Sequence, residues 1–363
     1  MDAVARKTLF ALLVILVIIS SACKAKPAPE PTLTEPPLKS NPTAKPSLTP
    51  EPTSTPYPTL IPQVESNCPP GGWSQYTEED GLADNWPRTM VVDQIGRVLV
   101  GYLIGDISLF HNGVWTSMPY TPGAPTYEIN SIIPLDDGTL WVGTQGGQVS
   151  LYRGGTWKMW TIQAEDQNTT VYSLEIAPDG RVWAATWNGI FQLQGDQWQP
   201  ISKPVPEDFL FSGKTLYLDD EDGLWVGARR GLYYYKDGSW GPPAPGENGV
   251  QDVSDIEIDR FGNLWFSGPG GVLVFDGSTW TRVYPSGSQY NPGGSVSVNG
   301  IAFGPDDRVW IADSEGVSVY ENGVWQTVIP GVGSADIKLT GVEIDPWGAA
   351  WFTSNEGVLC YNP

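Results

Sequence analysis

Histidine, cysteine and basic residues are scarce in this chain of 363 residues, and each shortage argues against a class of function. The sequence has 1 His, 3 Cys, and 20 Lys and Arg against 41 Asp and Glu, which gives a net charge of −21. Without a second His or a free Cys, the usual nucleophile–base pairs and His or Cys metal sets cannot be assembled. Phosphate binding needs a basic stripe, and none is visible. We therefore expect no cofactor, no resident metal, no nucleic-acid partner and a monomeric protein.

Long hydrophobic runs are also lacking, except near the N-terminus. Two basic residues precede an apolar run over 9–19, which is short for a membrane-spanning helix and typical of an export signal. Its end resembles a bacterial lipoprotein signal, in which Cys23 would be lipidated, although Ser20 stands where that pattern usually has Leu, Val or Ile. Ordinary cleavage just before Cys23 stays open. We expect 1–22 to be a signal peptide, and the exported protein to be lipid-anchored at the bacterial cell surface or in the periplasm.

The segment 23–68 has no apolar periodicity that could build a core. Residues 24–67 contain 12 Pro and 7 Thr, a composition typical of extended linkers. At roughly 3 Å per residue in polyproline geometry, such a tether reaches up to about 100 Å. The sequence therefore predicts a spacer between a membrane anchor and a folded domain over 69–363.

The folded part is a repeat of about 42 residues. One tryptophan of each repeat follows an Asp-Gly or related turn, and we call this set the strand-two tryptophans: Trp141, Trp183, Trp225, Trp265, Trp310 and Trp351, with Leu99 in the first copy. A second set, which we call the outer tryptophans, recurs with a similar spacing: Trp73, Trp115, Trp157, Trp198, Trp240, Trp280 and Trp325. Seven copies of one phrase indicate a repeat architecture.

Each copy contains four short β-rich runs separated by turn residues, which is the layout of one propeller blade. In the second copy the runs cover 131–135, 139–144, 148–152 and 156–162. The last copy lacks its outer run, and the orphan run 71–76 at the front matches the missing piece. The prediction is an all-β, seven-bladed propeller whose two ends share the seventh blade, with the strand-two tryptophans packed between blades.

Two cysteines fit this closure. Aligned on the repeat, Cys68 falls beside Cys360 at the seam, and a disulfide there would join two distant ends of the chain. The alternative is a pair of separate small hydrophobic residues.

The only histidine and one acidic run are both predicted to lie in turns. The only histidine, His111, lies in a hairpin turn where other copies have Lys-Asp-Gly or Glu-Asn-Gly. The acidic run 219–223 has the composition of a calcium loop, but it aligns with the Asp-Gly turns of the other copies, which favours a turn.

The repeats 179–191 and 81–93 resemble those of the two-component regulator propeller family. That resemblance implies an extracytoplasmic sensor, often part of a membrane kinase, with some members recognising carbohydrates. No kinase or regulator segment accompanies the repeats here, so signalling by this chain alone is not expected. Residues 259–266 are also similar to repeats of streptogramin B lyases, which use a histidine with magnesium, but the only histidine is not in a loop that could face the centre.

Propellers bind ligands at the face formed by the strand-two to strand-three loops and the crossovers between blades. The ligand-binding candidates on this face are the aromatic residues Trp86, Tyr102, Tyr127, Tyr172 and Trp187 and the basic pair Arg229 and Arg230. Aromatic rings suit the apolar faces of sugars, and guanidinium groups supply paired donors. The sequence predicts a non-catalytic binding or sensor-like module for a carbohydrate or an envelope protein. The alternative is a carboxylate-dependent or lyase-type propeller enzyme acting on an extracellular substrate.

Overall fold

The computed structural model describes residues 65–163, 169–201, 212–241, 252–269, 271–284, 298–313, 316–321, 324–328 and 337–363. The predicted signal peptide, Cys23 and the tether up to residue 64 lie outside the described residues. Within the described part, no helix has the length and apolar character that crossing a membrane requires.

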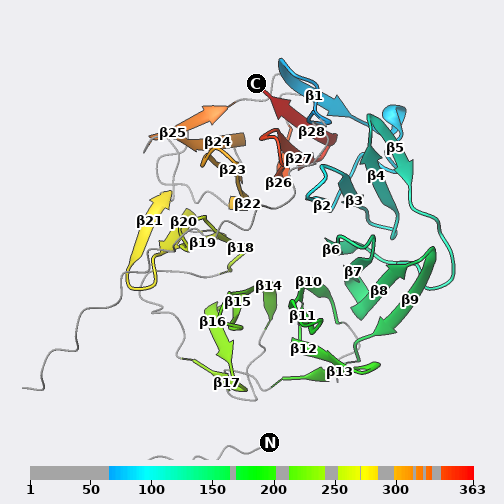
Figure 1. The fold of residues 1–363 in the computed structure, drawn as a ribbon, viewed down its shortest axis with the longest axis vertical. Coiled ribbons are helices and arrows are strands. Elements are labelled where there is room, and N and C mark those ends of the chain that lie inside the picture. Colours follow the sequence, from blue (N-terminus) through cyan, green and yellow to red (C-terminus); the bar gives the residue numbers. More distant parts are fainter. Residues whose placement is uncertain are drawn as a thin grey trace, which may run out of the picture. The chain divides into compact units, whose positions relative to one another are not determined.

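The strands form seven antiparallel sheets of four strands each, arranged as blades around a centre (Figure 1). The innermost strands are β2 (Thr89–Val92), β6 (Ile129–Pro134), β10 (Val171–Ile176), β14 (Gly213–Leu218), β18 (Asp255–Ile258), β22 (Val298–Phe303) and β26 (Leu339–Ile344). The second strands are β3 (Val98–Gly101), β7 (Leu140–Thr144), β11 (Val182–Thr186), β15 (Leu224–Ala228), β19 (Leu264–Gly268), β23 (Val309–Asp313) and β27 (Ala350–Ser354). The third strands are β4 (Ile107–His111), β8 (Gln148–Arg153), β12 (Gly189–Gln194), β16 (Gly231–Lys236), β20 (Gly271–Phe275), β24 (Gly316–Glu321) and β28 (Gly357–Asn362). The outer strands are β5 (Val114–Ser117), β9 (Thr156–Thr161), β13 (Gln197–Pro200), β17 (Ser239–Trp240), β21 (Trp280–Tyr284), β25 (Val324–Val328) and β1 (Gly72–Tyr76).

This architecture confirms the seven-bladed propeller. In the second blade, each predicted run agrees with an observed strand to within two residues at each end. The helical elements of the described residues are two short 3-10 turns, η1 (Glu78–Asp80) and η2 (Gln145–Gly147). The period of the repeat and its turn residues were therefore sufficient to define the fold.

The strand-two tryptophans pack between neighbouring blades, as predicted. Trp141 contacts the cluster of Leu174 and Phe191, which belong to the next blade, and is 8% exposed. The equivalent Trp351 is fully buried. Burial of such large side chains between sheets contributes to the apolar packing that binds one blade to the next.

Aspartate turns position several of these tryptophans. In the fifth blade, one carboxylate oxygen of Asp259 accepts hydrogen bonds from the amides of Phe261 and Asn263, both at 2.9 Å. The other oxygen accepts a bond from the indole N–H of Trp265 at 3.0 Å. Asp219 and Asp345 make the same set of contacts in their blades, including the indole bond. The carboxylate of Asp219 therefore accepts hydrogen bonds from its own turn and from the indole of Trp225. This agrees with the prediction that residues 219–223 form a turn.

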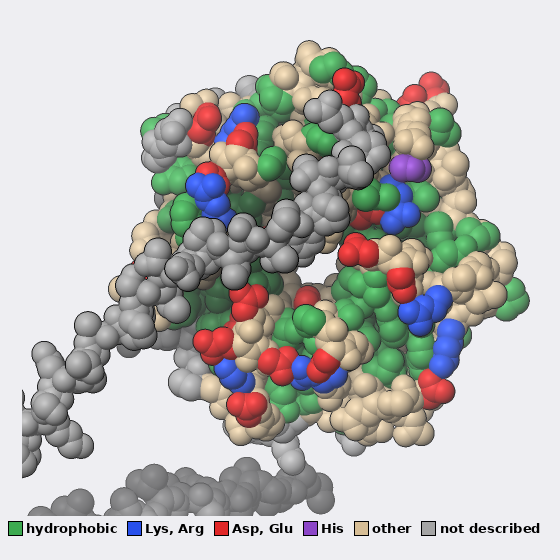
Figure 2. Space-filling view, viewed as in Figure 1, with side chains coloured by type: hydrophobic (Ala, Val, Ile, Leu, Met, Phe, Trp, Pro, Cys, Tyr) green, Lys and Arg blue, Asp and Glu red, His purple; other side chains and the backbone are tan. Residues whose placement is uncertain are grey.

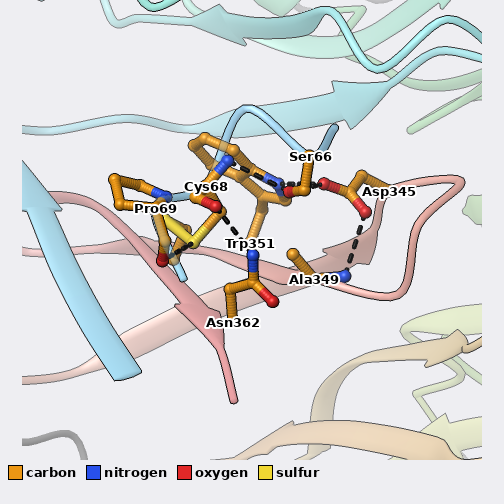
Figure 3. Close-up of a disulfide and its surroundings, with 8 residues drawn as sticks. Ser66, Cys68, Pro69, Asp345, Ala349, Trp351 and Asn362 are labelled. Atoms are coloured by element: carbon orange, nitrogen blue, oxygen red, sulfur yellow. Dashed lines mark hydrogen bonds between the residues drawn. A yellow bond between two sulfur atoms is a disulfide. The ribbon is translucent and has the colours of Figure 1, made fainter. Parts of the chain in front are cut away.

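The seventh blade closes the ring with strands from both ends of the chain. β1 pairs antiparallel with β28, with Ser74 opposite Cys360, so the orphan N-terminal run completes the last blade as predicted. A disulfide joins Cys68 to Cys360, whose Cα atoms are 5.9 Å apart (Figure 3). The side-chain amide of Asn362 also donates to the carbonyl of Cys68 at 2.8 Å. The seam is thus held by strand pairing, a covalent bond and side-chain contacts together.

Candidate functional site

A channel of about 950 Å³ passes through the centre of the ring and is lined by all seven innermost strands. Figure 2 shows its opening at the middle of the ring, with Asp and Glu side chains nearby. Because the lining comes from every blade, residues about 40 positions apart in sequence meet here. The channel therefore brings together side chains from all seven blades.

β-Bulges at the start of five innermost strands place side chains at one end of the channel. The innermost strands β6, β10, β14, β22 and β26 each shift register near their first residue, where one residue has no partner on the second strand. The unpaired residues are Asn130, Tyr172, Lys214, Asn299 and Thr340, and all of them line the channel. Bulges re-aim side chains and occur often beside functional sites. Five bulges at one repeat position therefore supply polar side chains to one mouth of the channel.

Some of these side chains also connect neighbouring blades. Asn130 donates through its side-chain amide to the carbonyl of Val171 at 3.0 Å, and Asn299 makes the equivalent bond to Leu339 at 2.9 Å. The ammonium group of Lys214 lies 2.5 Å from a carboxylate oxygen of Asp252. Partners in the next blade therefore already orient the cation of Lys214 and the amides of Asn130 and Asn299 at this mouth.

Deeper in the channel lies a layer of carboxylates. Glu175, Glu257 and Glu343 occupy the same register position, each opposite the strand-two tryptophan of its blade. All three line the channel together with Asp255. Asp255 accepts hydrogen bonds from the amides of Ile256 and Ile301, both at 3.0 Å.

Burial raises the pKa of each of these carboxyl groups, because the charged form loses hydration. The pKa of Glu175 rises to about 7 and that of Glu343 to about 8. Burial raises the pKa of Asp255 to about 6, and that of Glu257 well above its usual range, where the charges of Asp255, Glu343 and Glu175 add to the effect. At neutral pH the layer is thus partly protonated and offers O–H donors as well as acceptors.

The other features of catalysis are sparse in the described part of the chain. His111 ends β4 at an exposed hairpin turn, as the sequence predicted. Among the described residues, no group of three or more His, Cys, Asp or Glu is arranged to hold a metal ion. What the channel can do chemically is donate and accept protons through carboxyl groups, or bind a polar group.

The structure places the predicted ligand-binding residues in four settings. On the crossover face, Trp86 is 60% and Tyr127 is 49% exposed. Tyr172 is half-buried at a bulge and lines the channel, where burial raises the pKa of its hydroxyl group. Tyr102 is fully buried in the core, so its side chain offers no surface to a ligand. The reason is that it anchors its loop by packing in the cluster of Trp115 and Trp351.

The remaining candidates lie in loops between second and third strands. Trp187 is half-buried, whereas Arg229 and Arg230 are exposed. The amide of Trp187 donates to the carbonyl of Thr170, and that of Arg229 to the carbonyl of Ser212. These matching bonds confirm that the two loops occupy the same repeat position on adjacent blades. Their role in binding stays a prediction.

Sequence reasoning missed the carboxylate layer. Its signal was present as a Glu placed between two aliphatic residues at the end of each of the strands β10, β18 and β26. Burying an ionisable side chain costs free energy, so such a residue within a buried strand is a candidate for a functional role.

Comparison with known proteins supports the fold and leaves function open. No family model and no curated protein matches the chain. The chain is similar in structure to a streptogramin B lyase, with TM-score 0.66 and 14% identity over 80% of this chain and 98% of that one. It is equally similar to the extracellular domain of BT3049 from B. thetaiotaomicron, described as a hybrid two component system, with TM-score 0.66 and 18% identity over 82% of this chain. The match spans 42% of that chain. A structure of YCF48 bound to D1 peptide is also similar, with TM-score 0.61 and 13% identity over 80% of this chain and 95% of that one. Identities this low establish a shared fold only.

Proposed function

We propose that this protein is an exported, non-catalytic binding propeller of the sensor type, which recognises a glycan or an envelope protein on the crossover face around the channel mouth. The observation that carries the proposal is the set of five matched bulges, which deliver polar side chains to one mouth. The exposed rings of Trp86 and Tyr127 lie on the crossover face as well.

The similar solved structures support this class of function. They include extracellular domains of sensor systems and a propeller in complex with a peptide. The tether and the lipid anchor at Cys23 would place such a module away from the membrane surface.

The experiment tests binding with the full chain on a glycan array and against a displayed library of short random peptides. If a ligand is found, we expect Trp187→Ala combined with Arg229→Gln and Arg230→Gln to weaken binding, because these loops border the same face. The melting temperature should change little, because the two arginines are exposed and Trp187 is a half-buried loop residue outside the strands. Unaltered affinity in this variant would move the site to the Trp86 side of the face.

A carboxylate-dependent enzyme is the second candidate, and the buried carboxyl layer favours it. A raised pKa is what a general acid needs at neutral pH. Turnover of an oligosaccharide or other extracellular substrate that is lost in Glu175→Gln, Glu257→Gln and Glu343→Gln would replace the binding proposal with this one. Turnover that survives all three substitutions would exclude the layer as the catalytic group.

A further inference from the structure

The loop between β3 and β4 departs from the repeat. In the other blades, two or three residues connect the second and third strands, and glycine and polar residues predominate, as in Gln145–Gly147 and Asn355-Glu356. In the first blade, five residues make the connection, and its tip carries the adjacent aliphatic residues Leu103 and Ile104. Leu103 is 46% and Ile104 is 66% exposed.

The loop is held firmly although its tip is exposed. Tyr102 at its base is fully buried, and its carbonyl accepts a hydrogen bond from the amide of Ile129 at 3.0 Å. Gly105 has φ +88° and lies so close to the next crossover that an added Cβ would be 2.4 Å from the carbonyl oxygen of Pro125. The aliphatic tip is therefore a fixed surface that the fold exposes and does not bury.

Two exposed aromatic residues lie in the crossovers that border this loop. Tyr127 follows the crossover residues that contact Gly105. Trp86 comes two residues before Arg88, whose amide donates to the carbonyl of Gly101 at the end of β3 and whose side chain pairs with Glu128 at 3.2 Å. We call Trp86, Leu103, Ile104 and Tyr127 the apolar corner. Large apolar side chains that gather at the surface of a soluble protein usually mark an interaction site.

Acidic residues occur in the same loop and crossover as the apolar corner. Asp106 follows Gly105 in the loop between β3 and β4, and Asp84 accepts a hydrogen bond from the amide of Trp86 at 2.9 Å. The exposed residues of η1, all acidic, join the same crossover, because the amide of Glu78 donates to the side-chain oxygen of Asn85 at 2.8 Å. Arg88 is paired with Glu128. The corner thus combines exposed apolar side chains with neighbouring carboxylates on the same segments, which we call the acidic rim.

We propose that the apolar corner docks a segment of another protein in which large apolar side chains are flanked by Lys or Arg. The inference rests on the proposed binding function and assigns a partner class to one part of the crossover face. The apolar centre would bury the partner's hydrophobic side chains, and the acidic rim would attract its cations.

A glycan fits this corner less well. Sugar recognition combines aromatic faces with donors and acceptors for the hydroxyl groups, and the side chains of Leu103 and Ile104 supply neither. The acidic rim would repel anionic glycans and phosphorylated peptides. The chemistry of the corner therefore favours a basic, apolar peptide segment.

The test selects short random peptides against the full chain and measures the affinity of one selected peptide. We expect enrichment of Leu, Ile, Phe or Trp together with Lys or Arg, and an affinity that falls as salt rises. The double variant Leu103→Ser, Ile104→Ser should weaken binding about ten-fold or more, as for residues at the centre of an interface. Val114→Ser is the matched control, because Val114 is 59% exposed in the same blade but lies in the outer hairpin.

The outcomes separate this inference from the broader proposal. Selected peptides that bind equally well to the double variant, or that lack basic residues, overturn the inference. A glycan that binds the array and is lost in Trp86→Ala also overturns it, while leaving the binding function in place. Higher peptide affinity after deletion of residues 24–64 would identify the protein's own tether as the occupant and would overturn a docking site for another protein.

Discussion

The carboxylate layer makes a strong prediction about stability and pH. Glu343 is half-buried in the channel, opposite Trp351, and burial raises its pKa from 4.5 to about 8. A group whose pKa is raised by folding favours the folded state fully at pH below its unfolded value. That contribution is lost as pH rises through the folded pKa. The propeller should therefore be less stable at pH 8 than at pH 5.

The magnitude follows from the shift. The pKa of Glu343 rises from 4.5 to about 8, which is about 3.5 pKa units, or about 5 kcal/mol at about 1.4 kcal/mol per unit, and about 3.5 kcal/mol of this unfolding free energy is lost between pH 5 and pH 8. The channel is open to solvent, which screens part of the effect, and we expect about 2 kcal/mol. Glu343→Gln keeps the size of the side chain but cannot ionise. The variant should gain that amount at pH 8 and change little at pH 5.

The assay is urea unfolding followed by tryptophan fluorescence at several pH values. Glu79→Gln is the control for net charge, because Glu79 is exposed in η1. If Glu343→Gln and the wild-type protein lose stability equally between pH 5 and pH 8, then Glu343 does not titrate as its burial requires and the argument is wrong.

Three further substitutions test the fold. Cys68→Ser should lower the free energy of unfolding by about 3 to 5 kcal/mol, because the disulfide with Cys360 closes a loop of nearly the whole domain; equal denaturation midpoints with and without reductant would contradict this. Trp351→Ala, which empties a fully buried position, should cost about 3 to 5 kcal/mol by denaturant titration, whereas an effect below about 1 kcal/mol would show that the site collapses without loss. Asp259→Ala removes the acceptor for two turn amides and the indole of Trp265 and should cost about 1 to 3 kcal/mol, measured as a fall in melting temperature relative to wild type.

Much of the fold could be predicted from local patterns. Turn residues and β-rich runs are encoded within each repeat, so the strands of the second blade were located to within two residues. The shared seventh blade followed from a missing outer strand and a matching orphan run, and Cys68 was assigned beside Cys360 on the same alignment. These features depend on neighbours in sequence or on equivalence between repeats.

The candidate site was harder to predict, because equivalent repeat positions have different environments. Tyr102 and Trp187 follow the second strands of their blades at the same position, yet Tyr102 is fully buried and Trp187 is half-buried. Tyr172 belongs to a crossover by sequence, and only the structure shows that the bulge of β10 directs it into the channel lining. Burial depends on what the next blade places against each side chain, and a single repeat does not contain that information.

The sequence by itself determined the number of blades, the way the ring closes and the acidic character of the protein, because each follows from counting residues or aligning repeats. Only the tertiary structure decided that Glu175, Glu257 and Glu343 share one layer and that Leu103 and Ile104 stay exposed. The physical reason is that a closed ring brings together innermost strands from blades that are distant in the chain. The pKa of a carboxyl group and the exposure of a loop tip depend on those distant neighbours.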